Sequence, residues 1–230
     1  MDECQSDRNR ACKSWPGKLC VSDFDHPQAV WAAVLLAAGA SSRMGTPKML
    51  LPWGKTSVLG HLIAQWQKLG SVQTCVVLAS GSQPLAQEIG RLDFPPGNCI
   101  YNPAPQLGMF SSIRCAARWA GWRSDLTHWA IILGDQPHLP IDLLRALLLF
   151  AAAHPAKICQ PGHQGRARHP VLLPRLAFDQ LAHSTHGTLK GFLNDLSANV
   201  ALCEMDDDAL DLDLDTPADY EQAKRRFPGS

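Results

Sequence analysis

The chain of 230 residues lacks an excess of charge of either sign. Its 21 Lys and Arg residues balance 21 Asp and Glu residues, so the formal net charge is zero. A neutral chain exerts no general attraction on nucleic acid or on an acidic membrane surface, and any anion that it binds must be held by a local set of donors. We therefore expect a small-molecule ligand and no nucleic-acid partner.

Long hydrophobic runs are also missing. No apolar run approaches the ~20 residues that a membrane helix requires, and the longest, around residues 143–153, is interrupted by Arg145. The first thirty residues are polar, mixed in charge and without the apolar stretch of a secretory signal. These features predict a cytoplasmic protein that does not associate with a membrane.

Eight cysteines are present, but none forms the Cys-x-x-Cys pair of a zinc knuckle or a redox motif. The five in the body of the chain lie mostly in apolar stretches, where a buried thiol behaves as a small hydrophobe: Cys75, Cys99, Cys115, Cys159 and Cys203. The three others are evenly spaced near the N-terminus, and the sequence offers no role for them: Cys4, Cys12 and Cys20.

Residues 1–29 mix charges with Pro, Gly and Ser and show no sustained apolar period, so we expect a flexible N-terminal extension followed by one domain over residues 30–230. From Val30 onward, strand-like runs alternate with segments of helical spacing. The expected strands cover 30–37, 72–79, 99–101 and 127–133, and the expected helices 57–69, 83–91, 109–119 and 141–153. This alternation predicts an α/β fold with a single doubly wound, mainly parallel, Rossmann-like sheet.

Beyond residue 157 the alternation changes. We expect short strands at 158–160, 169–173, 199–203 and 210–214, small helices within 175–195, and a terminal helix over 218–227. The C-terminal part should thus add a short antiparallel element to the sheet. Ligands of open sheets of this kind bind at the carboxyl ends of the strands, and the candidate motifs all follow such ends.

The segment Leu36–Lys48 follows the first strand and is rich in small residues. Gly39 and Gly45 allow close approach of a phosphate, while Arg43 and Lys48 add direct cationic donors, so the segment fits an anion cradle. For a Gly-rich loop considered alone, an ordinary tight turn is an equally good explanation. It is neither a Walker A loop nor a Gly-x-Gly-x-x-Gly dinucleotide turn, which disfavours an oxidoreductase that uses a nicotinamide cofactor.

Carboxylates occur at two further places. Asp135 directly follows the fourth strand, and Asp211, Asp213 and Asp215 occupy alternate positions that share one face if that stretch is extended. Magnesium prefers one or two carboxylates together with phosphate oxygens and water, so one Asp from each place would suffice. The alternative is that Asp135 caps a turn and that the acidic stretch is merely solvated.

The third strand leads to another candidate anion site. Gly108 precedes a helix whose first turn contains Met109, Ser111 and Ser112, and a helix N-terminus of this kind offers N–H groups and hydroxyls to an anion. A plain helix cap is the alternative.

Taken together, Leu-Ala-Ala-Gly-x-Ser-x-Arg-Met-Gly-x-x-Lys over residues 36–48 resembles the signature of the molybdenum cofactor nucleotidyltransferases, in the MobA-like NTP transferase family. The resemblance implies a nucleotidyltransferase in which four residues of this segment lie against the base and ribose: Leu36, Ala37, Ala38 and Gly39. Arg43 and Lys48 would neutralise the triphosphate and the leaving pyrophosphate. The metal, Mg²⁺, would be held by Asp135 and Asp215, with Asp213 as the nearby alternative.

The cytidylyltransferase branch of this family is favoured by Asn-Pro-x-x-x-x-Gly-Met-x-x-Ser-Ile, which begins at Asn102, and by Ala38 at a position where the guanylyltransferase branch typically has Gly. The resemblance therefore implies CTP in preference to GTP. The expected binding residues beyond the first loop are Ser80, Asn102, Gly108, Met109, Ser111, Ser112 and His169.

The residues expected to face the acceptor substrate differ from those of the cytidylyltransferase branch. Residues 166–171 resemble the Arg-Gly-His-Pro-Val segment of that branch, but Arg168 stands where Gly is usual, and Lys190 replaces an Arg further on. Lys is a point charge and cannot form the bidentate fork of Arg. The resemblance implies a phosphorylated acceptor such as molybdopterin, release of pyrophosphate, and a molybdoenzyme that receives the product. The alternatives are a sugar or polyol phosphate acceptor, a core role for His169, or a non-catalytic chaperone that binds the cofactor.

Overall fold

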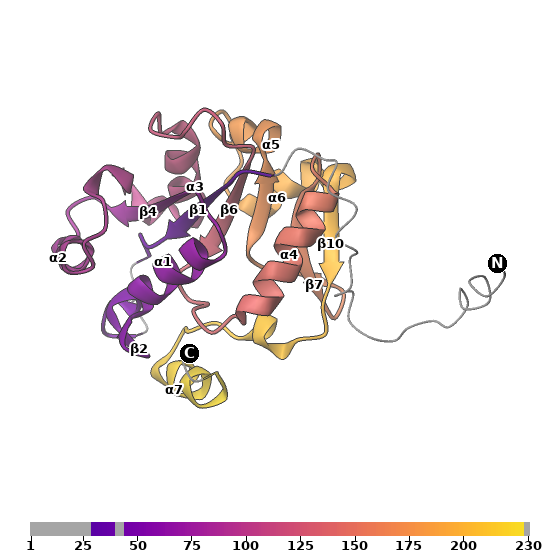
Figure 1. Ribbon diagram of the computed structural model, residues 1–230. Coiled ribbons are helices and arrows are strands. Elements are labelled where there is room, and N and C mark those ends of the chain that lie inside the picture. The colour runs from indigo at the N-terminus through magenta and orange to yellow at the C-terminus, as the bar shows by residue number, and fades with distance from the viewer. Residues whose placement is uncertain (1–28, 40–43, 228–230) are drawn as a thin grey trace, which may run out of the picture.

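A central sheet of eight strands organises this computed structural model, which describes residues 29–39 and 44–227 (Figure 1). Along the sheet the strands run in the order β10, β7, β9, β6, β1, β4, β5, and β8 pairs with β7. The expected extension up to residue 28 lies outside the described residues, as does Arg43. The strands are β1 (Trp31–Leu36), β4 (Gln73–Ala79), β5 (Cys99–Asn102), β6 (His128–Leu133), β7 (Ile158–His163), β8 (Arg166–Ala167), β9 (Val171–Pro174) and β10 (Val200–Glu204).

The sheet is mainly parallel. Strand β1 pairs in parallel with both β4 and β6, β5 continues from β4, and β10 pairs in parallel with β7. Strand β9 runs antiparallel to β6 and β7, and β8 antiparallel to β7. The predicted doubly wound sheet with a short antiparallel element in the C-terminal part is therefore confirmed.

Helices cover both faces of the sheet, because the side chains of a strand alternate between the two faces. In β1, Ala33 and Leu35 pack into one core cluster and Ala32 and Val34 into the other, all four fully buried. The first cluster lies under α1 (Val58–Lys68), α2 (Gln83–Arg91), α4 (Ile141–Ala153) and α7 (Pro217–Arg226). The second lies under α3 (Met109–Arg118), α5 (Arg175–Leu181) and α6 (Leu189–Asp195).

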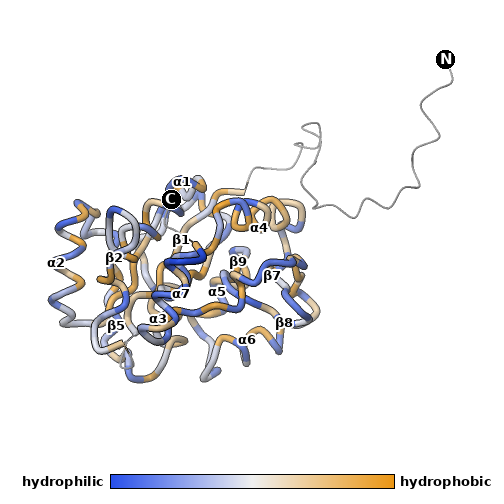
Figure 2. Tube along the Cα trace, turned by 90° about the horizontal axis from the view of Figure 1, so that it is seen from below, coloured by the Kyte–Doolittle hydropathy of each residue, from blue (hydrophilic) through white to orange (hydrophobic). Residues whose placement is uncertain are grey.

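The helices are amphipathic, as Figure 2 shows for α2 and α6, where hydrophobic and hydrophilic residues alternate along the turns. Among the described residues, no helix combines the length and the apolar character that crossing a membrane would require. Short elements complete the fold: the hairpin β2 (Pro52–Trp53) and β3 (Thr56–Ser57), and the 3-10 turns η1 (Lys48–Leu50), η2 (Pro96–Asn98), η3 (Pro105–Leu107), η4 (Ser197–Asn199) and η5 (Asp208–Asp211).

The prediction of a strand over residues 210–214 is wrong. Residues 210 and 211 belong to the 3-10 turn η5, and its N-cap residue Asp207 accepts a hydrogen bond from the Ala209 N–H at 2.9 Å. Leu210 and Leu214 are both buried in the same core cluster, although their alternation with aspartates suggested an extended strand. Core packing of two leucines thus produces the apolar pattern without a strand.

The body cysteines have the structural role that their apolar surroundings predicted. All five are free thiols, and four of them are buried. Burial raises the pKa of the Cys159 thiol to about 12, so it stays protonated at neutral pH. A protonated, buried thiol is a poor nucleophile.

We predict that Leu35→Ala lowers the free energy of unfolding by about 3 kcal/mol, because it leaves a cavity beside the central strand. The side chain of Leu35 is fully buried, whereas that of Leu176 is 78% exposed. Leu176→Ala is the matched control and should change stability by less than ~0.5 kcal/mol. Urea denaturation of both variants measures the difference, and equal losses would contradict this description of the core.

Candidate active site

A cavity of about 320 Å³ opens at the carboxyl edge of the sheet, where β1 and β6 lie side by side. Strand register aligns Leu36 with Leu133, so the segments that follow these two residues leave the sheet together. The lining residues come from the end of β1, from η1, from the start of α3 and from the end of β6: Leu36, Ala37, Ala38, Gly39, Lys48, Met49, Pro105, Gly108, Met109, Ser112, Leu133, Gly134 and Asp135.

Gly134 permits the close approach of the two strand ends. A Cβ atom at this position would stand 2.4 Å from Met49 Sδ and 2.9 Å from the carbonyl oxygen of Leu36, both too close for any other residue. The sequence reasoning did not single out Gly134. The signal that could have identified it is a glycine placed directly between a buried strand and a candidate metal ligand.

Lys48 joins the two acidic places that the sequence suggested. Its Nζ atom lies 3.3 Å from Asp135 Oδ2 and 3.4 Å from Asp215 Oδ1. The side chains of Lys48, Asp135 and Asp215 are 17%, 24% and 36% exposed. The backbone contributes as well, because the Leu214 N–H donates to the Asp135 carbonyl oxygen at 3.0 Å. One cationic group thus lies against two carboxylates that are 80 residues apart in the sequence.

The other two aspartates of the acidic stretch have different partners. Asp213 Oδ1 accepts a hydrogen bond from Gln136 Nε2 at 2.9 Å, and burial, followed by the charges of Asp135 and Asp215, raises the pKa of Asp213. Asp211 lies in η5 and accepts a hydrogen bond from Arg168 Nε at 2.7 Å. The expectation that Asp211 shares a face with Asp213 and Asp215 is therefore wrong, because the stretch is not extended there.

The carboxylate pair has the chemistry of a site for a hard cation. Asp135 Oδ1 is buried and has no hydrogen-bond partner among the described residues. Within residues 29–39 and 44–227, no three His, Cys, Asp or Glu side chains stand close enough to hold an ion by themselves. A cation bound by Asp135 and Asp215 would therefore need further oxygen ligands from a bound molecule, which is how magnesium commonly binds phosphates.

The start of α3 is fixed by Asn102, which is 1% exposed at the end of β5. Its Nδ2 donates to Ser111 Oγ at 2.7 Å and to Ser112 Oγ at 2.9 Å, and its Oδ1 accepts from the Ala104 N–H at 2.9 Å. Ser111 Oγ also donates to the Gly108 carbonyl oxygen at 2.7 Å. Asn102 and Ser111 are thus engaged within the protein, and they hold Gly108 and Ser112 at the cavity wall.

Ser80 is exposed beyond the end of β4, and its N–H donates to the Asn102 carbonyl oxygen at 2.9 Å. It does not line the cavity. Arg43, expected beside the phosphates, lies outside the described residues, so its role stays a prediction.

His169 lines two further cavities, of about 440 and 840 Å³, on the β9 side of Asp135. Burial lowers the pKa of His169 to about 4, against the opposing effects of the Asp135 charge and of a hydrogen bond with the Ile131 backbone. The imidazole is therefore neutral at neutral pH. Its Nδ1 atom has no hydrogen-bond partner among the described residues.

The larger of these cavities carries a positive lining. Arg166, Arg168 and Lys190 line it, and no Asp or Glu is among its described lining residues. Met109 lines both this cavity and the one beside Lys48, so the two adjoin. The two adjoining cavities can therefore hold two anions next to each other, with Lys48 at one cavity and Arg166, Arg168 and Lys190 at the other.

The known proteins that this chain resembles belong to one family of nucleotidyltransferases. The sequence pattern of the MobA-like NTP transferase domain matches residues 33–200. A molybdenum cofactor cytidylyltransferase of Escherichia coli (strain K12) is 28% identical over 199 residues, which cover 84% of this chain and 95% of that protein. A molybdenum cofactor guanylyltransferase of Mesorhizobium japonicum is 31% identical over 156 residues, which cover 66% of this chain and 71% of that protein.

Among solved structures, Rv0371c from Mycobacterium tuberculosis H37Rv aligns with a TM-score of 0.66 and 26% identity, covering 86% of this chain and 98% of that one. A second structure of Rv0371c is a complex with manganese, with a TM-score of 0.63, 24% identity and the same coverage of both chains.

We predict that Lys48→Met increases the affinity for Mn²⁺ in the absence of nucleotide by about tenfold, because it removes a cation that competes for Asp135 and Asp215. Titration followed by electron paramagnetic resonance measures free Mn²⁺ directly. Lys55→Met, at an exposed lysine that does not line the cavity, should leave the affinity unchanged. Weaker Mn²⁺ binding by Lys48→Met would show that Lys48 does not compete with the metal.

Proposed function

The chain belongs to the MobA-like NTP transferase domain family, and we propose that it transfers CMP from CTP to a phosphorylated acceptor and releases pyrophosphate. The observation that carries the proposal is the contact of Lys48 with both Asp135 and Asp215 at the wall of the nucleotide-sized cavity. A purely acceptor-binding protein would have no use for a triphosphate cradle with two metal carboxylates.

Magnesium is the proposed metal, held by Asp135 and Asp215. When bound, it neutralises phosphate oxygens and the charge that develops on the departing pyrophosphate. The unpartnered Asp135 Oδ1 and the hard carboxylate donors suit such an ion. The Lys48 ammonium, which neutralises the two carboxylates in the ligand-free protein, would then contact the triphosphate, together with Arg43.

The reaction that we propose needs no protein nucleophile. A phosphate oxygen of the acceptor attacks the α-phosphorus of CTP, the new P–O bond forms, and the bond to the β-phosphate breaks so that pyrophosphate leaves. A phosphomonoester is already anionic near neutral pH, so no general base is required. The protein's contribution is then to align the two anions and to neutralise their charge.

CTP is favoured by the shape of the first loop. Ala38 lines the cavity and is 7% exposed, so its methyl group occupies space that a glycine would leave open. Less space on the base side favours a pyrimidine over a purine. Relatives of both kinds exist, a cytidylyltransferase over most of this chain and guanylyltransferases over about two thirds of it or less.

The acceptor that we propose is a molybdopterin-type phosphate. The cavity of about 840 Å³ is large enough for a fused-ring molecule with a phosphate, and Arg166 and Lys190 give it cationic donors. Arg168, which stands where the cytidylyltransferase branch usually has Gly, donates a hydrogen bond to Asp211, and both side chains line a cavity together with His169. Neutral His169 can accept or donate a hydrogen bond to the acceptor without adding charge.

We predict that Asp135→Asn reduces pyrophosphate release from CTP by on the order of 10³-fold, because the amide cannot balance the charge of a metal ion. A coupled pyrophosphate assay with Mg²⁺ and a panel of phosphorylated acceptors measures the loss. The matched control is Asp179→Asn on the exposed surface of α5, which should retain full activity. Near-normal release by Asp135→Asn would rule out the metal assignment.

The choice of nucleotide has a separate test. We predict that CTP with Mg²⁺ raises the melting temperature by several degrees more than GTP with Mg²⁺, since selective binding to the native state stabilises it by mass action. Thermal denaturation with each of the four triphosphates measures the order. The variant Ala38→Gly should reduce the difference between CTP and GTP. A larger shift with GTP in the unmodified protein would assign the guanylyltransferase activity instead.

A further inference from the structure

The segment after β6, which carries Asp135, lies along the acidic stretch that carries Asp215. Three hydrogen bonds join the two segments: His138 Nε2 to the Ala209 carbonyl oxygen at 3.0 Å, Gln136 Nε2 to Asp213 Oδ1 at 2.9 Å, and the Leu214 N–H to the Asp135 carbonyl oxygen at 3.0 Å. The partners follow opposite orders along the chain, so the two segments run antiparallel. The two proposed metal ligands therefore come from segments that are fastened to each other.

Of these three bonds, only the one from Gln136 joins two side chains, and it ends on a carboxylate. Gln136 is 5% exposed, and a buried amide that donates to a carboxylate makes a stronger hydrogen bond than one to a neutral acceptor. The acceptor, Asp213, precedes Asp215 by two residues, and the Asp215 N–H donates to the Asp213 carbonyl oxygen at 2.9 Å. The placement of Asp213 therefore affects that of Asp215.

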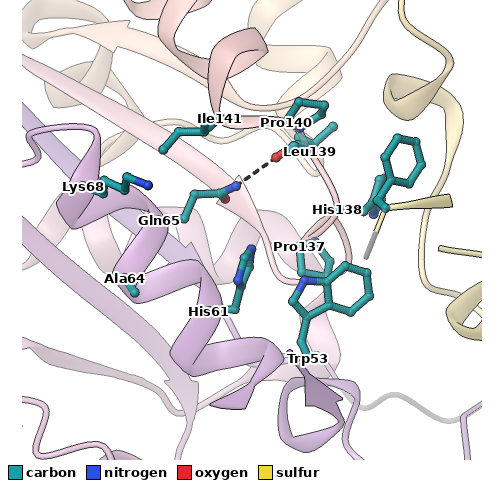
Figure 3. Close-up of a pocket in the computed structure, with 11 residues that line it drawn as sticks. Trp53, His61, Ala64, Gln65, Lys68, Pro137, His138, Leu139, Pro140 and Ile141 are labelled. Atoms are coloured by element: carbon teal, nitrogen blue, oxygen red, sulfur yellow. Dashed lines mark hydrogen bonds between the residues drawn. The ribbon is translucent and has the colours of Figure 1, made fainter. Parts of the chain in front are cut away.

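Gln136 is itself held in place by the residues that follow it. Figure 3 shows Pro137, His138 and Leu139 on the segment that faces α1, with Gln65 reaching across to Leu139. Gln65 Nε2 donates to the Leu139 carbonyl oxygen at 2.9 Å, and His138 is only 4% exposed. Because β6 fixes the chain on one side of Gln136 and α1 fixes it on the other, the Gln136 amide is a donor in a fixed position.

Asp213 requires such a donor, because the neighbouring carboxylates repel it. Burial, followed by the charges of Asp135 and Asp215, raises the pKa of Asp213 and so disfavours its anion. The hydrogen bond from Gln136 and the charge of Lys48 act in the opposite direction, and the hydrogen bond is the stronger of the two. Without the amide, repulsion would displace Asp213, and the adjoining Asp215 with it.

We propose that Gln136 is a positioning residue, which holds Asp213 apart from the metal ion and thereby presents Asp215 as the second metal ligand beside Asp135. The hydrogen bond distinguishes two aspartates that both suit a metal by residue type. Asp213 Oδ1 already accepts from the Gln136 amide, whereas Asp215 Oδ1 lies 3.4 Å from Lys48 Nζ. Gln136 touches no reacting atom and acts through Asp213. This inference rests on the proposed function, because it concerns the proposed metal site.

The first test is the affinity of the full chain for Mn²⁺ without nucleotide, measured by electron paramagnetic resonance. Gln136→Met keeps the length of the side chain but removes the donor, and it should weaken Mn²⁺ binding about fivefold, the typical value of one hydrogen bond. Gln73→Met is the matched control. Gln73 also donates through Nε2, to the Gly121 carbonyl oxygen at 2.9 Å, but it lies at the start of β4, at the opposite edge of the sheet. It should leave the Mn²⁺ affinity unchanged.

Conservative variants of the two aspartates separate the ligand from the residue that is held apart. Asp215→Asn should weaken Mn²⁺ binding by more than about tenfold, because it removes the charge of a metal ligand. Asp213→Asn should weaken it by less than about threefold, because only a nearby charge is lost and the amide oxygen still accepts from Gln136. Equal losses would show that Asp213 binds the metal and would overturn the proposal. Both aspartates are partly or largely exposed, so these variants should fold even if Gln136→Met does not.

A double-mutant cycle tests whether Gln136 acts through Asp213. In a chain that already carries Asp213→Ala, the further change Gln136→Met should lower the Mn²⁺ affinity by less than about twofold, because the acceptor of its hydrogen bond is gone. If Gln136 served only to pack the core, the loss would be about fivefold in both backgrounds, and the proposal would be overturned. Urea denaturation of each variant verifies that the chain is folded under the conditions of the titration.

Failure of this inference and failure of the proposed function give different results. If Asp135→Asn binds Mn²⁺ as tightly as the unmodified chain does, no metal binds at this place, and both are refuted. If Asp135→Asn loses Mn²⁺ binding but Gln136→Met does not, the metal assignment stands and Gln136 has no positioning role. If every Mn²⁺ result is as expected but no triphosphate releases pyrophosphate, the proposed function is refuted and the role of Gln136 at the metal site stands.

Discussion

The Lys48 ammonium between the Asp135 and Asp215 carboxylates is the interaction on which the candidate site depends. Three segments that are distant in the sequence meet there, and each is held by a different part of the fold: Lys48 by the turn after the first loop, Asp135 by the end of β6, and Asp215 by the residues before α7. Two partly buried carboxylates at one place repel each other unless a cation stands with them. Lys48 supplies that charge to both carboxylates. Under the proposed function, a bound triphosphate would attract the ammonium and leave the carboxylates available to a metal ion.

Two cavities lie beside this charge cluster, and the proposed function assigns one to each substrate. Strand β1 ends beside the cavity proposed for the nucleotide, whereas His169, two residues before the antiparallel strand β9, lines the cationic cavity proposed for the acceptor. Asp135 lies at the end of β6, between the two halves. Under the proposed function, Asp135 would lie between both substrates at the point where the strand direction changes, and Gly134 allows the ends of β1 and β6 to approach closely there.

The segments that follow Lys48, Asp135 and Asp215 in the sequence also meet a second time, on the face of the sheet that α1, α4 and α7 cover. The segment after Asp135, the helix after the Lys48 turn and the helix after Asp215 converge again at Trp53, His61 and His138. Hydrogen bonds on this face, from Gln65 to Leu139 and from His138 to Ala209, hold the residues that follow Asp135.

Much of this structure follows from the sequence by local rules. Apolar runs flanked by Gly and Pro define the strands, helical spacing defines α1 and α4, and the alternation of the two predicts a parallel sheet with its loops at one edge. Asp135 was identifiable because it comes just after a strand, and Lys48 because it ends the small-residue segment that follows the first strand. Local rules fail where one apolar pattern fits two structures: Leu210 and Leu214 suggested a strand, but Leu210 lies in a 3-10 turn, Leu214 lies outside any regular element, and both are buried in the core.

The sequence by itself determined most of the element types, the strand ends at which the candidate residues lie, and the residue types available there for a phosphate or a metal. Only the tertiary structure decided which aspartate meets Lys48, since Asp211, Asp213 and Asp215 are alike in sequence but are held by Arg168, Gln136 and Lys48, respectively. It also decided that Asn102 is engaged internally. The reason is that such contacts join residues tens of positions apart, and their geometry is set by packing of the whole core rather than by the pattern of any one segment.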